Sequence, residues 1–385
     1  MLRFLSRRLI QMFFLFIIFL SIVWLLLQLM PGDITDTLIG DPNIPLSTRL
    51  ELSQRLGLNQ PLYIQYWTYV TNFFKGELGV SFSRYPQPVW NILWEAIPRT
   101  LVLVLTATLI AYWMGFKSGK LIAWGRGGKT EQGFIVGGIF LQTVFYPWFA
   151  IVMLWTFGFF FGWFPIGRFI SVGLWQGSGL DATSIFQQLI LSTFVAFFVY
   201  LGARSIIKRA APTLVTQQRL QRVVSGLIIL SLVAFWYYHP ARTYVADIVW
   251  HTVLPVATLG LVLFGAVMLI TRTSMLETLG EDYILTARAK GLPNGDIRDR
   301  HAARNALLPV VTSFVLALGT VIGGAIITEE IFSWPGMGKL FLDGIIVSDI
   351  PLVAGALALT GVLTLFAHLV VDVLYTVLDP RIRIS

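Results

Sequence analysis

Long apolar runs are the feature that most constrains what this chain can fold into. Leu9 to Met30 is almost entirely apolar, and about 20 such residues are enough to cross the hydrocarbon core of a bilayer as one helix. Further runs follow at 101–116, 134–163, 185–207, 223–238, 251–270, 310–327 and 353–375. Because backbone groups in lipid must bond internally, these runs are expected to be helices. The sequence therefore predicts an all-α polytopic membrane protein with about eight transmembrane helices.

Composition supports this class and removes several others. Only 12% of the residues are charged, against about 25% in soluble domains, and the mean hydropathy is +0.74. The chain has no cysteine, which excludes disulfides, thiolate metal sites and cysteine catalysis. The first apolar run is longer than a signal-peptide core, and Pro31-Gly32-Asp33 follows it in place of a small-x-small cleavage site. We therefore expect a retained first span.

The net charge of +8 raises the question of nucleic-acid binding. With the N-terminus placed inside and the loops assigned alternately, the inside segments hold 20 of the 28 Lys and Arg residues, and the outside segments hold 8. This is the positive-inside bias of a membrane protein with both ends in the cytoplasm. The surplus of positive charge therefore needs no nucleic acid to explain it.

A polar segment from Glu277 to Pro309 separates two of the apolar runs. Asp282 is suited to cap a helix that continues to Ala289, because its carboxylate can accept N–H groups of the first turn. Gly291 and the following proline would end that helix. A second helix is expected from Asp296 to Leu307, ending before Pro309. We interpret the segment as a surface at the membrane face on which a partner docks.

Four groups of residues in this segment form an ordered pattern: Glu281-Asp282-Tyr283, Thr286 to Leu292, His301-Ala302 and Arg304 to Pro309. This pattern resembles the cytoplasmic coupling loop of ABC-importer permeases, in the version carried by the dipeptide, oligopeptide and nickel permease family. The general form of the motif has Glu six residues before the glycine, where this chain has Leu285. The distance from Gly291 to Pro309 also follows the peptide-permease version, and the resemblance is to the first permease subunit of such systems.

The resemblance implies a type I ABC-importer permease fold with an added helical hairpin. It implies a permease subunit that forms a translocation path and is not itself an enzyme, with ATP hydrolysis in partner subunits and no cofactor or metal in this chain. The implied partners are a second homologous permease, two ATPase subunits, an external substrate-binding protein and the lipid bilayer of a prokaryotic cell membrane. The implied substrates are di- or oligopeptides; nickel chelates and oligosaccharides stay open, and no substrate-contacting residue is identified. The residues that this resemblance assigns to ATPase coupling are Glu281, Asp282, Tyr283, Ala287, Arg288, Lys290 and Gly291.

Other segments resemble the same family and divide the chain into parts. They are Met30 to Asp33, Leu56 to Leu58, Gly76 to Ser81, Thr328 to Phe341, and the end from Val371. The expected parts are an N-terminal span (1–30), an external segment (31–97), spans two and three (98–180), the added transmembrane hairpin (181–240), a core region (241–380) with the coupling loop at 272–308, and a cytoplasmic tail (381–385). Short helices are expected at 47–56 and 60–74 of the external segment.

A glycine-rich stretch from Ala123 to Thr130 fits a relaxed phosphate-binding motif, with Ala in place of the first Gly. A phosphate-binding loop needs a preceding strand, a following helix and a sheet to hold it. Because this stretch lies between two spans, we interpret it as a flexible basic loop.

Polar residues inside the spans bear on an alternative function, that of a self-sufficient secondary transporter or channel. His368 and Asp372 are four residues apart and could pair or relay protons, although a helix contact by Asp372 near the cytoplasmic interface is favoured. The glycine pairs 133/137 and 319/323 could line a translocation path, but close helix packing is the favoured interpretation. The scarcity of intramembrane charges argues against the alternative, and the lack of a catalytic constellation argues against a membrane enzyme.

Overall fold

The structure is a computed structural model, and it describes residues 2–29, 60–210, 213–320 and 325–378. Within these ranges the secondary structure is helical, apart from one isolated β-bridge between Val80 and Pro88. The first half holds α1 (Leu2–Leu29), α4 (Leu62–Lys75), α5 (Val89–Trp124), α6 (Lys129–Thr143), α7 (Tyr146–Met153), the π-helix η1 (Leu154–Phe160) and α8 (Val172–Trp175). The second half holds α9 (Ala182–Ala210), α10 (Leu214–Tyr238), α11 (Arg242–Leu279), α12 (Asp282–Ala289), α13 (Asn294–Asp296), the π-helix η2 (Ile297–Ala302), α14 (Ala303–Thr320), α15 (Ile326–Ile331), α16 (Met337–Ile346) and α17 (Ile350–Leu378).

Six of these helices are long and apolar enough to cross a membrane, namely α1, α5, α9, α10, α11 and α17. A seventh span results if α6 and the helix from Tyr146 to Phe160 are taken together, with a bend of 109° between them. The bend lies where the sequence places Pro147, which is accommodated in the first turn of α7 because proline lacks only an N–H that is unpaired there. The seventh predicted span, 310–327, begins in α14 and continues into residues 321–324, which lie outside the described residues.

Two predicted helices in the external segment have different outcomes. The helix expected at 60–74 is confirmed as α4, which Gly76 ends with φ +78°. The N–H groups of Gly76 and Glu77 bond to the carbonyls of Phe73 and Asn72, the pattern that closes a helix through a left-handed residue. The helix expected at 47–56 lies outside the described residues.

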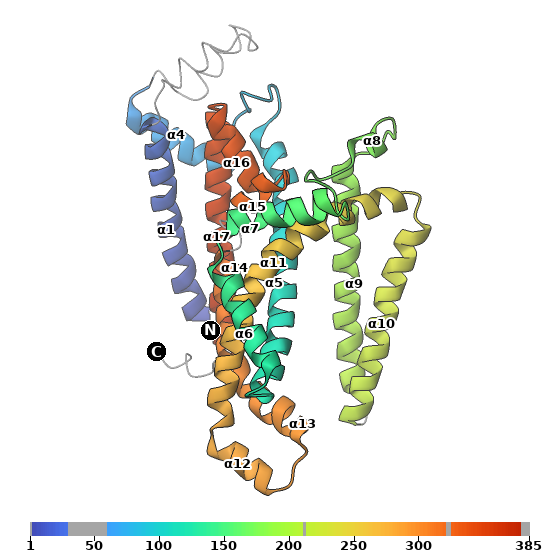
Figure 1. Cartoon of the computed structure of the whole chain (residues 1–385). Coiled ribbons are helices and arrows are strands. Elements are labelled where there is room, and N and C mark those ends of the chain that lie inside the picture. The colour runs from blue at the N-terminus through green and yellow to red at the C-terminus, as the bar shows by residue number, and fades with distance from the viewer. Residues whose placement is uncertain (1, 30–59, 211–212, 321–324, 379–385) are drawn as a thin grey trace. The chain divides into compact units, whose positions relative to one another are not determined.

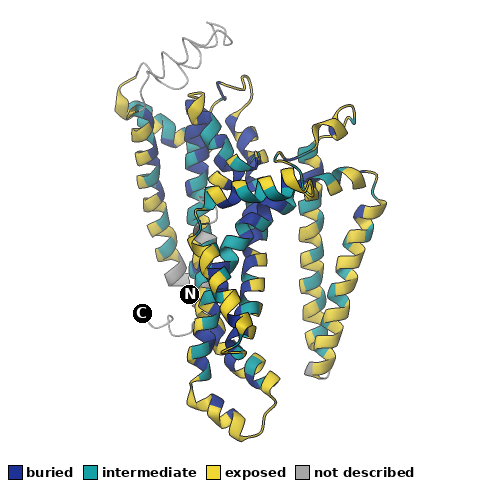
Figure 2. Ribbon diagram, viewed as in Figure 1, coloured by how far each residue is buried: buried dark blue, intermediate teal, exposed yellow. Residues whose placement is uncertain are grey.

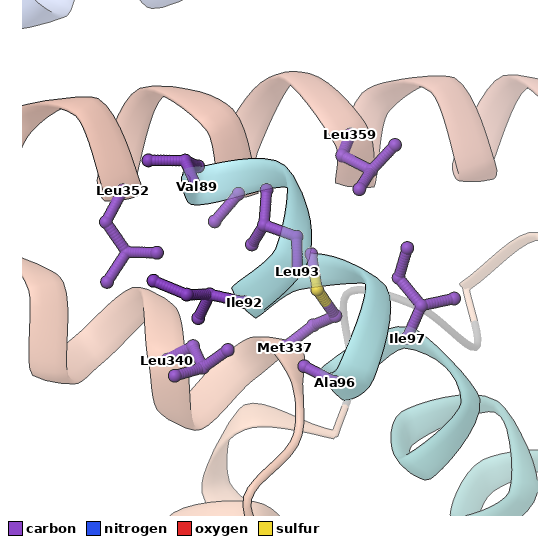
Figure 3. Packing of buried hydrophobic residues seen from close by; sticks show 10 residues of the cluster. Val89, Ile92, Leu93, Ala96, Ile97, Met337, Leu340, Leu352 and Leu359 are labelled. Atoms are coloured by element: carbon purple, nitrogen blue, oxygen red, sulfur yellow. The ribbon is translucent and has the colours of Figure 1, made fainter. Parts of the chain in front are cut away.

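The contacts divide the chain into two compact units. The first unit holds residues 1–156 and 255–385, and the second holds 157–254. In the first unit, α5, α16 and α17 bury an apolar cluster (Figure 3) that includes Val89, Leu93 and Ala96 with no exposed surface, packed with Met337 and Leu352. In the same unit α1 packs along α17, and Arg8 forms an ion pair with Asp372 at 3.4 Å. This contact agrees with the helix-contact interpretation of Asp372.

The second unit is built around the antiparallel pair α9 and α10. Trp236 donates its indole N–H to Ser192 at 3.0 Å across this pair. Asp247, in the second turn of α11, accepts hydrogen bonds from Ser171 and from the Trp175 indole, which fixes the short helix α8 to the start of α11. The predicted hairpin boundaries, 181 and 240, lie inside this unit.

Close helix packing in the first unit uses other glycines than the sequence indicated. A Cβ added at Gly133 or Gly137 would meet nothing within 4 Å, so the prediction of tight packing there was wrong. The other predicted pair reaches Gly323, outside the described residues. Close approaches to α11 are made instead by Gly115 and Gly119 on α5, where a Cβ would come within 2.8 Å or less of α11, and by Gly138 on α6, where a Cβ would clash with Met268. Sequence spacing shows that a helix face has small residues, and it does not show whether another helix lies against that face.

Candidate functional site

The polar loop, residues 280–302, joins α11 to α14 and lies at the end of the first unit that is farthest from α4 and α16 (Figure 1). Its first helix, α12, covers the residues that the sequence predicted, Asp282 to Ala289. The capping prediction was wrong by one position: Glu281 is the N-cap residue, with φ −77° and ψ 146°, and makes no side-chain cap hydrogen bond. Asp282 is the first helical residue, where a negative charge is favourable toward the helix dipole.

Gly291 closes α12 in the way the sequence indicated. Its φ is +71°, a left-handed conformation that side chains with a Cβ rarely adopt. The Leu292 N–H bonds to the Ala287 carbonyl at 3.3 Å, and the Gly291 N–H bonds to the Arg288 carbonyl at 2.9 Å. These two bonds are the Schellman arrangement, which satisfies the last carbonyls of the helix. The backbone reversal after α12 therefore depends on a residue without a Cβ.

The second half of the polar loop differs from the prediction. A helix was expected from Asp296 to Leu307 with a stop before Pro309, whereas α13 and η2 lead into α14, which continues through Pro309 to Thr320. Proline removes one hydrogen bond from the helix but leaves the rest of it intact, and such prolines are tolerated in membrane helices. The prediction that the helix stops before Pro309 was therefore wrong.

A buried apolar cluster fixes the polar loop to the ends of α5 and α11. Ile284 has no exposed surface, and Ala287 is 6% exposed. Fully burying a side chain of the size of Ile284 contributes about 1.5–3 kcal/mol, so α12 is held firmly by its inner face. The buried members of the cluster are Ala123, Met275, Ile284, Ala287, Ile297, Ala302, Ala303 and Ala306.

The predicted coupling residues divide into two groups in the structure. Ala287 faces the cluster beneath α12. The remaining six are exposed to solvent, and all of them lie along α12 or at its two ends. They are Glu281, Asp282, Tyr283, Arg288, Lys290 and Gly291. The sequence brought these residues together because they are neighbours along one short helix, but it could not tell the inner face from the outer one.

Polar contacts, which the sequence did not predict, add to the anchoring of the loop. The Lys120 ammonium group at the end of α5 lies 2.8 Å from the Asp299 carboxylate in η2. Asn305 of α14 donates to the Tyr283 hydroxyl at 2.7 Å. Hydrogen bonds from Arg298 and then from Lys120 hold the pKa of Asp299 below its ordinary value. The alternating charges of the segment gave no indication that Lys120 and Asp299 pair, because Lys120 lies on another helix.

The basic loop that resembled a phosphate-binding motif is held by a hydrogen bond between its own backbone and the Glu131 carboxylate. It lies between α5 and α6, with no strand before it. Glu131 is 5% exposed, accepts the Gly127 backbone N–H at 2.6 Å, and binds the Arg272 guanidinium of α11 at 2.9 Å through Nε. A backbone N–H that a phosphate loop would offer to its ligand is thus already bonded, which agrees with the interpretation as a basic loop.

Two buried carboxylates escaped the sequence reasoning. Glu329 has no exposed surface and accepts from the Thr100 hydroxyl at 2.6 Å and from the Lys339 backbone N–H at 3.0 Å. The Thr100 oxygen in turn accepts the Met337 N–H at 2.8 Å, so α5, α15 and α16 are joined in one network. Asp349, also fully buried, accepts from Ser83 and from the first turn of α17. In the sequence both acids stand in segments assigned to external loops, where charged residues are normally solvated.

Similarity to known proteins extends over the whole chain. Residues 205–384 match the family described as the binding-protein-dependent transport system inner membrane component, and residues 1–104 match its N-terminal membrane component. The chain is 31% identical over 383 residues to the di/tripeptide transport system permease protein DppB of Pseudomonas aeruginosa, covering all of this chain and 99% of the relative. It is 32% identical over 390 residues to the dipeptide transport system permease protein DppB of Escherichia coli K12, with the same coverage. It is 28% identical over 360 residues to the oligopeptide transport system permease protein AppB of Bacillus subtilis, covering 94% of this chain and 92% of the relative.

Proposed function

Because the chain belongs to the family of inner membrane components of binding-protein-dependent transport systems, we propose that it is a permease subunit of an ATP-driven importer for di- or oligopeptides. The peptide substrate rests on the relatives, which carry peptide-transport names and match the chain over its full length. The self-sufficient transporter is therefore set aside. Asp372, a candidate proton-relay residue of such a transporter, forms an ion pair with Arg8, and this suits a helix contact rather than a proton relay.

The proposed assembly contains a second, homologous permease, two ATPase subunits and an external binding protein. In this assembly the chain contributes half of the translocation path and needs no cofactor, because ATP is bound and hydrolysed by the partner subunits. In the described residues no group of three or more His, Asp or Glu side chains could hold a metal ion. The excess of Lys and Arg in alternate segments supports a cytoplasmic position for both the N- and the C-terminus.

The observation that carries the coupling role is the geometry of α12. Its inner face is fixed by Ile284 and Ala287, while its outer face and its ends present polar and apolar groups to solvent. Leu285 is 57% exposed and Tyr283 is 37% exposed, and apolar and aromatic groups of this kind are common at the centres of protein interfaces. We assign the outer face of α12 to the cleft of an ATPase subunit, with Arg288 and Lys290 at the rim.

The mechanism follows from how firmly the polar loop is attached to the membrane helices. ATP binding draws the ATPase subunits together, and α12 moves with the subunit that holds it. The buried cluster and the Lys120–Asp299 contact pass that displacement to α5 and α11. The path then switches between inward-open and outward-open states, because the ATPase contacts differ in free energy between those states.

Replacing Gly291 by valine tests the docking role. No atom lies within 4 Å of the added Cβ, so the change introduces no clash. It forces a β-branched residue to φ +71°, which costs about 1–3 kcal/mol, or reshapes the turn. We expect Gly291→Val to insert in the membrane normally but to show no peptide uptake. During affinity purification in mild detergent, this variant should no longer retain the ATPase subunits.

Gly295→Val is the matched control, because this glycine lies in the same loop, also has open space around it, and has no positive φ. It should retain uptake and bind the ATPase subunits. Normal uptake by Gly291→Val would contradict the docking assignment. A complex of normal composition that transports no di- or oligopeptide would instead contradict the substrate class.

A further inference from the structure

A cluster of cations lies at the closed end of the α9–α10 hairpin in the second unit. We name the four cations Arg204, Lys208, Arg219 and Arg222 the hairpin cluster; all four are exposed. A fifth exposed cation, Arg209, adjoins them. From 182 to 246 the sequence contains no Asp or Glu. The positive charge at this end of the hairpin is therefore not neutralised by acids of the hairpin itself.

The register of the two helices brings these cations to the same level of the hairpin. Gln217 donates its side-chain N–H to the Lys208 carbonyl at 3.4 Å, and Trp236 bonds to Ser192 farther along the pair. This antiparallel register places Arg204 at the height of Arg222, and Lys208 at the height of Arg219. Residues three or four apart share one face of a helix, so each helix presents its two cations on a single face.

Exposed apolar side chains occur in the same turns as the cations. Ile206 is 66% exposed, Leu220 is 42% exposed and Val223 is 58% exposed. Figure 2 shows α9 and α10 exposed or half-buried along almost their whole length, and both meet the length and composition of a membrane span. Turns that mix cations with exposed aliphatic side chains suit the boundary between hydrocarbon and headgroups, where long basic side chains reach toward the phosphates.

We propose that the hairpin cluster is a binding site for the phosphate headgroups of anionic phospholipids in the leaflet at that end of the hairpin. The cluster provides several guanidinium groups, which can bond two phosphate oxygens at once. Juxtamembrane groups of Lys and Arg bind anionic lipid surfaces, with a gain in affinity of about fivefold per cation. The bound lipid would fix the hairpin at a defined depth in the membrane.

The test uses the assembled transporter, reconstituted in nanodiscs of equal parts phosphatidylglycerol and phosphatidylcholine. The complex is extracted in mild detergent, and the lipids that remain bound are measured by mass spectrometry. The wild type should retain phosphatidylglycerol in excess over phosphatidylcholine. Arg204→Gln/Arg222→Gln should lower that excess at least fivefold, and raising the salt concentration before extraction should lower it in the wild type.

The control variant is Arg126→Gln/Lys129→Gln. It removes two exposed cations from another basic loop, one that contains the acid Glu131, and it should leave the phosphatidylglycerol excess unchanged. Basic residues also set membrane topology. The side of the membrane on which the closed end of the hairpin lies is therefore checked by thiol labelling of Gln218→Cys, which introduces a single thiol because the chain has no cysteine of its own. The Gln218→Cys thiol should be equally accessible with and without the two hairpin substitutions, which would show that the topology is preserved.

Three results would overturn the proposal. One is an unchanged phosphatidylglycerol excess in the hairpin variant, and another is an equal loss in the hairpin and control variants. The third is loss of a partner protein subunit, but not of lipid, from the hairpin variant, which would mean that the cluster binds protein. Loss of the excess with unchanged peptide uptake would support the lipid site without bearing on the transport function.

Discussion

Gly119→Ala tests the packing of α5 against α11, the two helices whose ends pack against the polar loop. A Cβ at Gly119 would lie 2.6 Å from the Met268 carbonyl oxygen and 2.6 Å from the Thr271 Cβ. Ordinary contacts begin at 3.4 Å, so the two helices must separate by about 0.8 Å at this point. The atoms in the way belong to a helix backbone and a β-branched side chain, and neither can rotate aside.

The magnitude follows from comparison with a glycine that has no such neighbour. Overpacking a well-packed site costs about 1–3 kcal/mol, while exchanging glycine for alanine within a helix gains up to about 1 kcal/mol. Gly137→Ala receives the same helical gain without the clash, because nothing lies within 4 Å of its added Cβ. The difference in unfolding free energy between the two variants is therefore expected to be about 1–3 kcal/mol, with Gly119→Ala the less stable.

The assay is equilibrium unfolding of both variants in mixed micelles, with peptide uptake measured in parallel. Because α11 ends at Leu279, three residues before α12 begins, a displaced α11 should also displace the coupling helix. Gly119→Ala is expected to lower uptake, and Gly137→Ala is not. Equal stability and equal uptake of the two variants would refute the contact between α5 and α11.

The other predictions concern the polar contacts of the first unit. Lys129→Ala should leave ATP hydrolysis by the assembled complex unchanged, and a large loss in that assay would favour a phosphate-binding role for its loop. Thr100→Val should destabilise the chain by about 1–3 kcal/mol in denaturant unfolding, because buried Glu329 loses its hydroxyl donor; Thr100→Ser should retain wild-type stability. The pKa of Asp299 is lowered in the folded state by hydrogen bonds from Arg298 and then from Lys120, so these contacts are fully stabilising above the ordinary carboxyl pKa, and that stabilisation is lost progressively as the pH falls from there through the lowered folded-state pKa. The hydrogen-exchange protection of α12 should therefore begin to fall below about pH 5 and should still be falling at about pH 3, and Asp299→Asn should show little change over that range.

The helices that cross the membrane were predictable because lipid imposes one rule along the whole chain. Without water to bond the backbone, an apolar run of sufficient length must form a helix. The bend near Pro147 and the end of α12 at Gly291 were predictable for a related reason, since proline lacks a backbone N–H and glycine lacks a Cβ. Pro309 misled the same reasoning, because a proline that lacks one bond need not end a helix whose remaining bonds are intact.

The contacts between segments were not predictable. Small-residue spacing indicated Gly133 and Gly137, yet the close approaches to α11 are made by Gly115 and Gly119 of α5 and by Gly138 of α6. Nothing in the sequence around Glu329 shows that its carboxylate is fully buried among donors from α5 and α16. Each of these features depends on a second helix that is more than a hundred residues away along the chain.

The sequence by itself determined that this chain crosses a membrane as helices and carries a polar helix that ends at Gly291, to whose seven candidate residues we assign the proposed coupling role. Those properties are local, since hydrocarbon length, charge bias and left-handed backbone are set within one segment. Only the tertiary structure decided that Ala287 faces inward while its six companions face solvent, and that Asp299 is held by Lys120. A helix has no inner face until another element packs against it, and in this chain the packing surface comes from the ends of α5 and α11.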